Sequence, residues 1–137
     1  MAALSGDRVT ARSFPGRRTV PVAASVTIYV GALVVVDSSG YARPGRASTT
    51  DKAIGIALQR VTNGATAGAV TVDVDCTQIG YFANLGGDAV TIASVGADCF
   101  VEDDQTVRAT SNTSTRVRAG KVWSIDSTNG VGVRFDQ

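Results

Sequence analysis

The clearest pattern of apolar and polar positions covers residues 26–43, VTIYVGALVVVDSSGYAR. Val26, Ile28 and Val30 alternate with Thr and Tyr, which is the period of a half-buried strand. The run ALVVV at 32–36 is continuously apolar and rich in β-branched residues, so it predicts a strand that is buried on both faces. The DSSG sequence that follows is typical of a turn. The pattern therefore predicts a central hairpin, with the later strands added around it.

Alternation predicts further strands along the rest of the chain. They are residues 53–60, with Ile54, Ile56 and Leu58 on one face; 69–75, with Val70, Val72 and Val74 inward; 89–93, with Val90 and Ile92 inward; a hairpin over 99–109; 116–126, with a bulge at Gly120; and 131–135. The predicted core includes Val34, Val36, Ile56, Val72 and Val122. Turns recur about every 8–12 residues, the spacing of a sandwich or barrel. Leu, Glu and Lys are scarce, which also disfavours helices. The sequence thus predicts an all-β fold, a small β-barrel or β-sandwich.

The N-terminal segment differs from the rest of the chain. Residues 1–18 show no apolar period and contain Pro15-Gly16, so they are predicted to form an extended N-terminal arm. Residues 19–137 are predicted to form one β-barrel or sandwich domain, since the length of 137 residues suits a single domain. Pro21 predicts that the first strand lies at a sheet edge or is an entry strand, because proline lacks a backbone N–H.

Charge is concentrated at the N-terminus. The net charge is +1, but residues 1–20 hold four arginines against one aspartate, leaving a net −2 on the remainder. The candidate binding residues are Arg8, Arg12, Phe14, Arg17 and Arg18. Phe14 is the one aromatic near them, so a stacking platform for nucleic acid is lacking. Two hypotheses stay open for this segment: a solvated tail, or an arm that becomes ordered on an acidic protein partner.

The residue types exclude most catalytic chemistry. The chain has no His, and its two cysteines, Cys76 and Cys99, lack metal-ligand spacing. The cysteines are expected to be small core residues, with a disulfide as the alternative. The acidic group at 102–104 could hold Ca²⁺ or act as an acid/base pair, but a solvated hairpin turn is favoured. The sequence therefore predicts no catalytic residues, no cofactor and no metal site.

Two further features bear on partners and location. No apolar run of about 18 residues exists, and Asp7 and Arg8 stand where a signal peptide needs apolar residues, so neither a membrane span nor secretion is expected. The aromatic residues that could stack on a sugar are Trp123, Tyr29, Tyr41 and Tyr81. Single aromatics on strands are more often core or interface anchors.

Four segments resemble the decoration, or cement, proteins of tailed-phage capsids. They are VPVAASVTIYVGALVVVDSSGYARPG at 20–45, AIGIALQRVTNGATAGAVTVDV at 53–74, DCFVEDDQTVRAT at 98–110 and AGKVWSIDSTNGVGVRF at 119–135. The most specific pieces are the Val-Pro-Val sequence before IYVGALV and the Asp-Asp-Gln-Thr-Val hairpin. The four segments cover most of the chain after residue 19.

This resemblance implies a function as well as a fold. It implies a compact β-barrel or sandwich without enzymatic activity, whose N-terminal arm lies on the outer capsid surface of the virion after synthesis in the bacterial cytoplasm. The implied partner is the major capsid protein. Symmetry favours a homo-oligomer, a trimer at capsid three-folds or a dimer at two-folds. The alternative functions are a β-sandwich that recognises host-surface carbohydrate, and an enzyme that uses the acidic turn.

Overall fold

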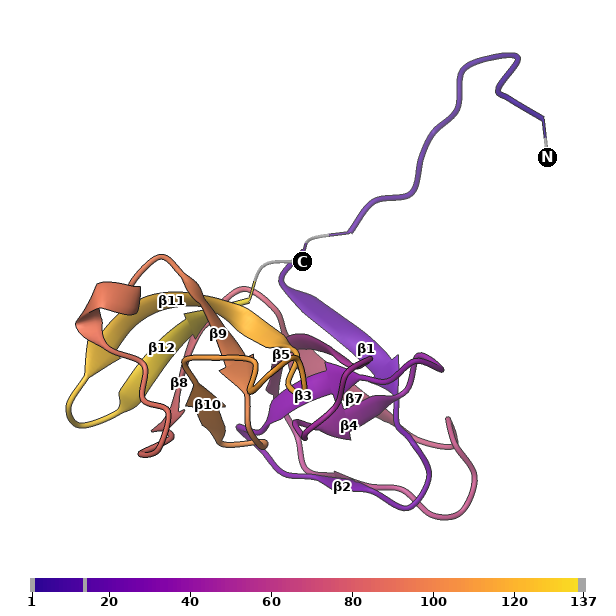
Figure 1. Ribbon diagram of the computed structural model, residues 1–137. Coiled ribbons are helices and arrows are strands. Elements are labelled where there is room, and N and C mark those ends of the chain that lie inside the picture. Colours follow the sequence, from indigo (N-terminus) through magenta and orange to yellow (C-terminus); the bar gives the residue numbers. More distant parts are fainter. Residues whose placement is uncertain (1, 14, 136–137) are drawn as a thin grey trace.

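The computed structural model describes residues 2–13 and 15–135 and is built almost entirely of strands (Figure 1). The one helical element of these residues is η1 (Ile92–Ser94), a single turn of 3-10 helix. In chain order the strands are β1 (Arg17–Pro21), β2 (Thr27–Ile28), β3 (Leu33–Val36), β4 (Ala42–Pro44), β5 (Lys52–Ala57), β6 (Val61–Thr62), β7 (Thr71–Asp75), β8 (Ile79–Asn84), β9 (Asp98–Val101), β10 (Thr106–Arg108), β11 (Arg118–Asp126) and β12 (Gly130–Arg134). The predicted all-β class is confirmed. In the part of the chain described here, no helix is long and apolar enough to cross a membrane.

The N-terminal half of the body forms a five-stranded antiparallel sheet in the order β1-β7-β5-β3-β4. β1 lies at one edge, as Pro21 predicted. The sheet curls, because Val22 bridges Ala42 at the opposite edge and the Ala23 N–H donates to the Ala42 carbonyl at 3.0 Å. The short β2-β6 pair lies beside it. The buried core inside the curl consists of Val20, Val22, Ile28, Ala32, Val34, Ala42, Ile54, Ala57, Val72 and Val74.

The C-terminal half forms a closed five-stranded barrel in the order β10-β8-β12-β11-β9. The β8–β10 pairing is parallel and the other pairings are antiparallel. Closure leaves the barrel without a free edge strand. Inside it, the rings of Phe82 and Phe135 meet edge to face, with centroids 6.1 Å apart. The body thus has two cores, one in the curled sheet and one in the barrel.

β3 joins the two cores. Leu33 and Val35 pack in the barrel core, whereas Val34 packs in the core of the curled sheet, and all three are fully buried. Because successive side chains of a strand point to opposite faces, a strand between two cores has to be apolar on both. The continuous apolar run at 32–36 predicted this burial, and the prediction is confirmed.

β5 corrects the predicted single apolar face of residues 53–60. Ile54 packs in the core of the curled sheet, Ile56 packs against the barrel core, and Leu58 lies beyond the strand and is exposed. The cause is a register shift against β3, where Ile54 is the extra residue. A bulge moves the following side chains to the other face of the strand. Strict alternation was therefore the wrong pattern for this segment.

The first half of the predicted hairpin is also different from the prediction. β2 covers Thr27–Ile28 alone, and Tyr29 and Val30 are exposed. The chain turns here, since the Ala32 N–H donates to the Tyr29 carbonyl at 3.1 Å. Gly31 takes a φ of 84°, the left-handed conformation that the third position of a type II turn requires. The strand therefore ends at Ile28, although the apolar alternation of the sequence continues to Val30.

Residues 89–93 do not form the predicted strand. Val90 is buried as expected, but Ile92 opens η1 and is exposed. The backbone N–H and carbonyl of Val90 bond to the side-chain amide of Asn84, both at 2.8 Å. The Asn84 side chain thus satisfies the backbone N–H and carbonyl of Val90, which a neighbouring strand would otherwise pair.

Other predictions are confirmed by the structure. Of the predicted core residues, Val34, Val72 and Val122 are buried as predicted, whereas Val36 and Ile56 are only partly buried. β9 and β10 form the predicted tight hairpin, and the β11 register shifts next to Gly120, where a bulge was expected.

Candidate functional site

The N-terminal arm stands apart from the body. Residues 2–13 are exposed, contain no strand and extend away from both cores (Figure 1). No hydrogen bond or ion pair joins these residues to the rest of the described chain. Arg8 and Arg12 of the predicted binding set lie on this segment and are exposed, whereas Phe14 lies outside the described residues. The arm therefore presents two exposed cations that are tied to the described body by no hydrogen bond or ion pair.

The other two predicted arginines belong to β1. Arg17 lies opposite Asp75 and Arg18 opposite Val74 on β7, so the strand begins inside the predicted arm of residues 1–18. Both arginines are exposed. The hydrogen bond that Asp75 accepts from the Thr77 backbone N–H is the main cause that lowers the pKa of Asp75, and the charge of Arg17 lowers this pKa further. The structure thus splits the predicted set into two residues on the arm and two on a rigid sheet edge.

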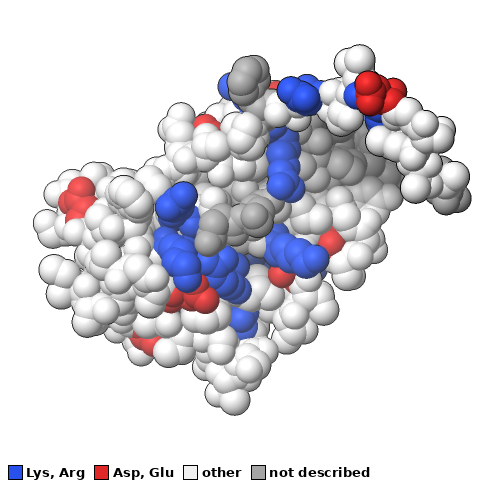
Figure 2. Space-filling model, turned by 90° about the horizontal axis from the view of Figure 1, so that it is seen from above, with Lys and Arg blue, Asp and Glu red and all other residues white. Residues whose placement is uncertain are grey.

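Arg18 forms part of a basic face on the body. It lines a hollow of about 440 Å³ between the curled sheet and the barrel, together with Lys52 of β5 and Arg118 of β11. Lys121 lies farther along β11. The Asp98 carboxylate links it to this cluster, because Asp98 lies 2.7 Å from Arg118 and 3.0 Å from Lys121. We call Arg18, Lys52, Arg118 and Lys121 the basic face. Figure 2 shows Lys and Arg side chains gathered on this side of the body and continuing toward the arm.

Sequence reasoning missed three of the four residues of the basic face. Lys52, Arg118 and Lys121 lie on strands that are far from Arg18 in the sequence. The outward position of Lys121 follows from its place beside the inward Val122. That the three side chains share one surface with Arg18 depends on the packing of the sheet against the barrel, which no local pattern encodes.

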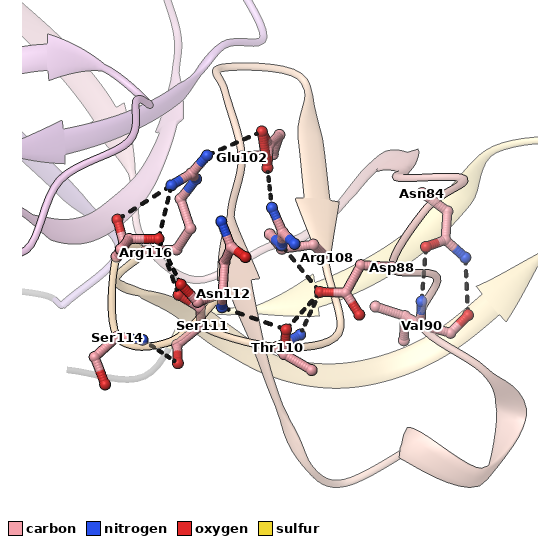
Figure 3. A network of polar contacts seen from close by, with 11 residues as sticks. Asn84, Asp88, Val90, Glu102, Arg108, Thr110, Ser111, Asn112, Ser114 and Arg116 are labelled. Atoms are coloured by element: carbon pink, nitrogen blue, oxygen red, sulfur yellow. Dashed lines mark hydrogen bonds and ion pairs between the residues drawn. The ribbon is translucent and has the colours of Figure 1, made fainter.

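The acidic hairpin turn forms part of a polar network (Figure 3). Glu102 accepts hydrogen bonds from Arg108 at 2.7 Å and from Arg116 at 3.4 Å. Arg108 also donates to Asp88 at 3.0 Å. The Arg108 hydrogen bond is the main cause that lowers the pKa of Glu102. Asp103 caps the turn by accepting from the backbone N–H of residue 105 at 2.9 Å, as expected for a hairpin turn.

Asp104, the third acidic residue of the turn, has a different environment. Burial raises the pKa of this carboxyl group, and the neighbouring Asp103 adds to the effect. Asp104 lines a hollow of about 420 Å³ with Tyr29 and Gln105. Among the described residues, no group of three or more His, Cys, Asp or Glu side chains is placed to hold a metal ion.

A strained loop follows the network. Asn112, Thr113 and Ser114 all have φ between 51° and 63°, the left-handed region that costs non-glycine residues about 1–2 kcal/mol each. The Arg116 N–H donates to the Ser111 carbonyl at 2.9 Å and closes the turn, while the Arg116 side chain bonds to Glu102 (Figure 3). The hydrogen bonds of Arg116 thus tie this loop to the polar network.

The cysteines are free in this structure. Cys99 is buried, and burial raises the pKa of its thiol to about 12. Cys76 is partly exposed, and burial is again the main cause of its raised pKa. Neither thiol therefore has the lowered pKa of a reactive cysteine.

The four candidate stacking residues lie in different surroundings. Tyr29 is exposed, with the Arg60 guanidinium 5.1 Å from its ring centroid. Tyr41 is partly buried. Tyr81 and Trp123 are exposed on the outer side of the barrel. The core aromatics of the barrel are instead the phenylalanines described above.

Comparisons with protein-family models, with curated proteins and with solved structures found no match to this chain.

Proposed function

We propose that this chain is a structural decoration protein that binds the outer surface of an icosahedral phage head and stabilises it by bridging neighbouring major capsid protein subunits. The observation that carries the proposal is the exposed arm, residues 2–13, which leads into β1 and the basic face. The arm has too few apolar side chains to gain much by folding back onto its own body. A partner therefore has to supply the contacts of the arm. The sequence resemblance implies that this partner is the major capsid protein.

The mechanism is the addition of weak contacts. The twelve residues of the arm reach at most about 40 Å, far enough to touch a capsid subunit beside the one under the body. Arginine forks suit the carboxylates of an acidic capsid surface. Each exposed ion pair contributes about 0.2–1 kcal/mol, so no single arginine is decisive. Once the body is bound, the arm binds at high effective concentration, and the two attachments together hold adjacent subunits.

The assembly follows the symmetry of the head. A homotrimer at the capsid three-folds is the favoured arrangement, with a dimer at the two-folds as the alternative. The protein acts without a cofactor or metal and binds neither nucleic acid nor membrane. The competing hypothesis of an enzyme at the acidic turn predicts metal-dependent turnover, in which Glu102 would have to leave its pairs with Arg108 and Arg116.

The test measures occupancy on undecorated heads by sedimentation. Deleting residues 2–13, or changing Arg8 and Arg12 together to Gln, should markedly lower occupancy, and added salt should weaken binding of the intact chain. Asp7→Asn is the matched control, because it removes a charge of the opposite sign from the same arm and should bind at least as well. If the deleted chain occupied heads as fully as the intact one, the arm would be a passive tail and this mechanism would be wrong.

A further inference from the structure

The outer face of the barrel carries a fixed aromatic ring. Tyr81 of β8, Gly132 of β12 and Ser124 of β11 lie side by side across three strands. The Tyr81 hydroxyl is 2.8 Å from Ser124 Oγ, and a Cβ added to Gly132 would lie 3.0 Å from Cε1 of the ring. The phenol therefore spans β12 over a residue without a side chain, and it remains 43% exposed. Both of its ends are held by a rigid, closed barrel.

A second exposed aromatic residue and an exposed cation lie on the two strands that follow β8 in the order of the barrel. Trp123 is the extra residue of a bulge in β11 and is 55% exposed. Arg134 of β12 points to the same side, because the flanking Val133 is buried, and it is exposed. Its backbone pairs with β11 and β8, whereas its side chain has no hydrogen bond or ion pair to the described part of the chain. Its cross-strand neighbour is Lys121, whose partner is Asp98.

We propose that this surface binds an acidic polysaccharide, with Tyr81 and Trp123 as stacking surfaces and Arg134 as the carboxylate ligand. The C–H groups on the face of a pyranose ring are weakly positive and pack against the negative face of an aromatic ring. The two aromatic residues lie two strands apart, about 10 Å, which suits consecutive sugars of one chain. The guanidinium fork binds the carboxylate of a uronic acid with two parallel hydrogen bonds.

The charge of this surface favours a sugar acid over its competitors. A nucleic-acid strand carries a phosphate at every nucleotide and needs a continuous series of cations. This surface offers Arg134 and the already paired Lys121. Tyr81 and Trp123 line none of the hollows described above, so they form an open surface and not a pocket. An exposed aromatic surface on which, among the described residues, the Arg134 side chain is a cation without an ion-pair partner fits a glycan that carries one carboxylate on each sugar.

The experiment is electrophoresis of the whole chain in native gels that contain polygalacturonate, with dextran gels as the neutral reference. The intact chain should be retarded by polygalacturonate and not by dextran. Trp123→Ala should weaken the apparent affinity about tenfold, the value of one lost stacking contact. Arg134→Gln should also weaken it. Tyr29→Ala and Arg60→Gln are matched controls, since they remove an exposed aromatic ring and the same charge elsewhere on the body, and they should bind like the intact chain.

Four results would overturn the proposal. They are equal mobility in the two gels, unchanged binding by folded Trp123→Ala, loss of binding on deletion of residues 2–13, and tighter binding to oligo(dT) than to polygalacturonate. The thermal midpoint of each variant shows whether it is folded. Arg134→Lys is a further check, because it keeps the charge and the fold but loses the fork, so it should bind less tightly than the intact chain. None of these measurements depends on whether the arm binds a capsid.

Discussion

The position of β3 between the two cores predicts that the body unfolds as one unit. Leu33 is fully buried in the barrel core, although its strand belongs to the curled sheet. Leu33→Ala removes three buried carbon groups, worth about 2.4 kcal/mol by transfer alone. The cavity left behind raises the expected loss to about 3–5 kcal/mol. A domain of this size has a total stability of about 5–15 kcal/mol, so the change should be large.

Urea unfolding followed by two probes tests this prediction. Trp123 fluorescence reports on the barrel, and far-ultraviolet circular dichroism reports on both halves. Leu33→Ala should lower both midpoints together, because β3 supplies side chains to both cores and neither half keeps its packing without it. Val30→Ala, at an exposed position, should change stability by less than about 0.5 kcal/mol. If the barrel signal alone shifted and the dichroism split into two transitions, the halves would fold independently and the shared-strand account would be wrong.

Three further predictions concern the arm, the polar network and the thiols. Deletion of residues 2–13 should leave the thermal midpoint of the body nearly unchanged in calorimetry, because these residues are exposed and no hydrogen bond or ion pair joins them to the described body. The pKa of Glu102 is lowered below its ordinary 4.5, so its stabilisation is present above that pH and is lost as the pH falls toward the folded-state pKa. Urea midpoints measured from about pH 6 down to about pH 3 should therefore fall less in Glu102→Gln than in the intact chain, and an identical slope would contradict this. Iodoacetamide should modify Cys76 before Cys99 in the native protein, with mass spectrometry as the readout, and rapid native labelling of Cys99 would contradict its burial.

The parts of the fold that follow from the sequence are those set by local alternation. The continuous apolar run at 32–36 predicted burial on both faces of β3, and the Val/Asp alternation at 69–75 predicted the inward side of β7. The prediction failed where a tertiary contact changed the local pattern. The bulge at Ile54 turned Ile56 to the other core. Gly55 lies beside it and, like Gly120 in β11, is the residue type that signals a bulge inside a strand, but the alternation of Ile54, Ile56 and Leu58 favoured a single apolar face.

The candidate site was predictable to a smaller extent. The arm arginines, Arg8 and Arg12, were visible as a charge excess without an apolar period. Lys52 and Arg118 were not, since they meet Arg18 only because the barrel packs against the curled sheet. Trp123 was identified as an aromatic strand residue, but its place two strands away from Tyr81 depends on the intervening β12.

Cryo-electron microscopy of undecorated heads incubated with the chain tests the central proposal most directly. The proposal predicts density for the body on the outer capsid surface at a symmetry axis, with residues 2–13 ordered along a neighbouring capsid subunit. Arg8 and Arg12 should lie beside acidic side chains of that subunit. Heads that carry no added density at saturating protein, or density that follows the body alone with no contact from the arm, would contradict it.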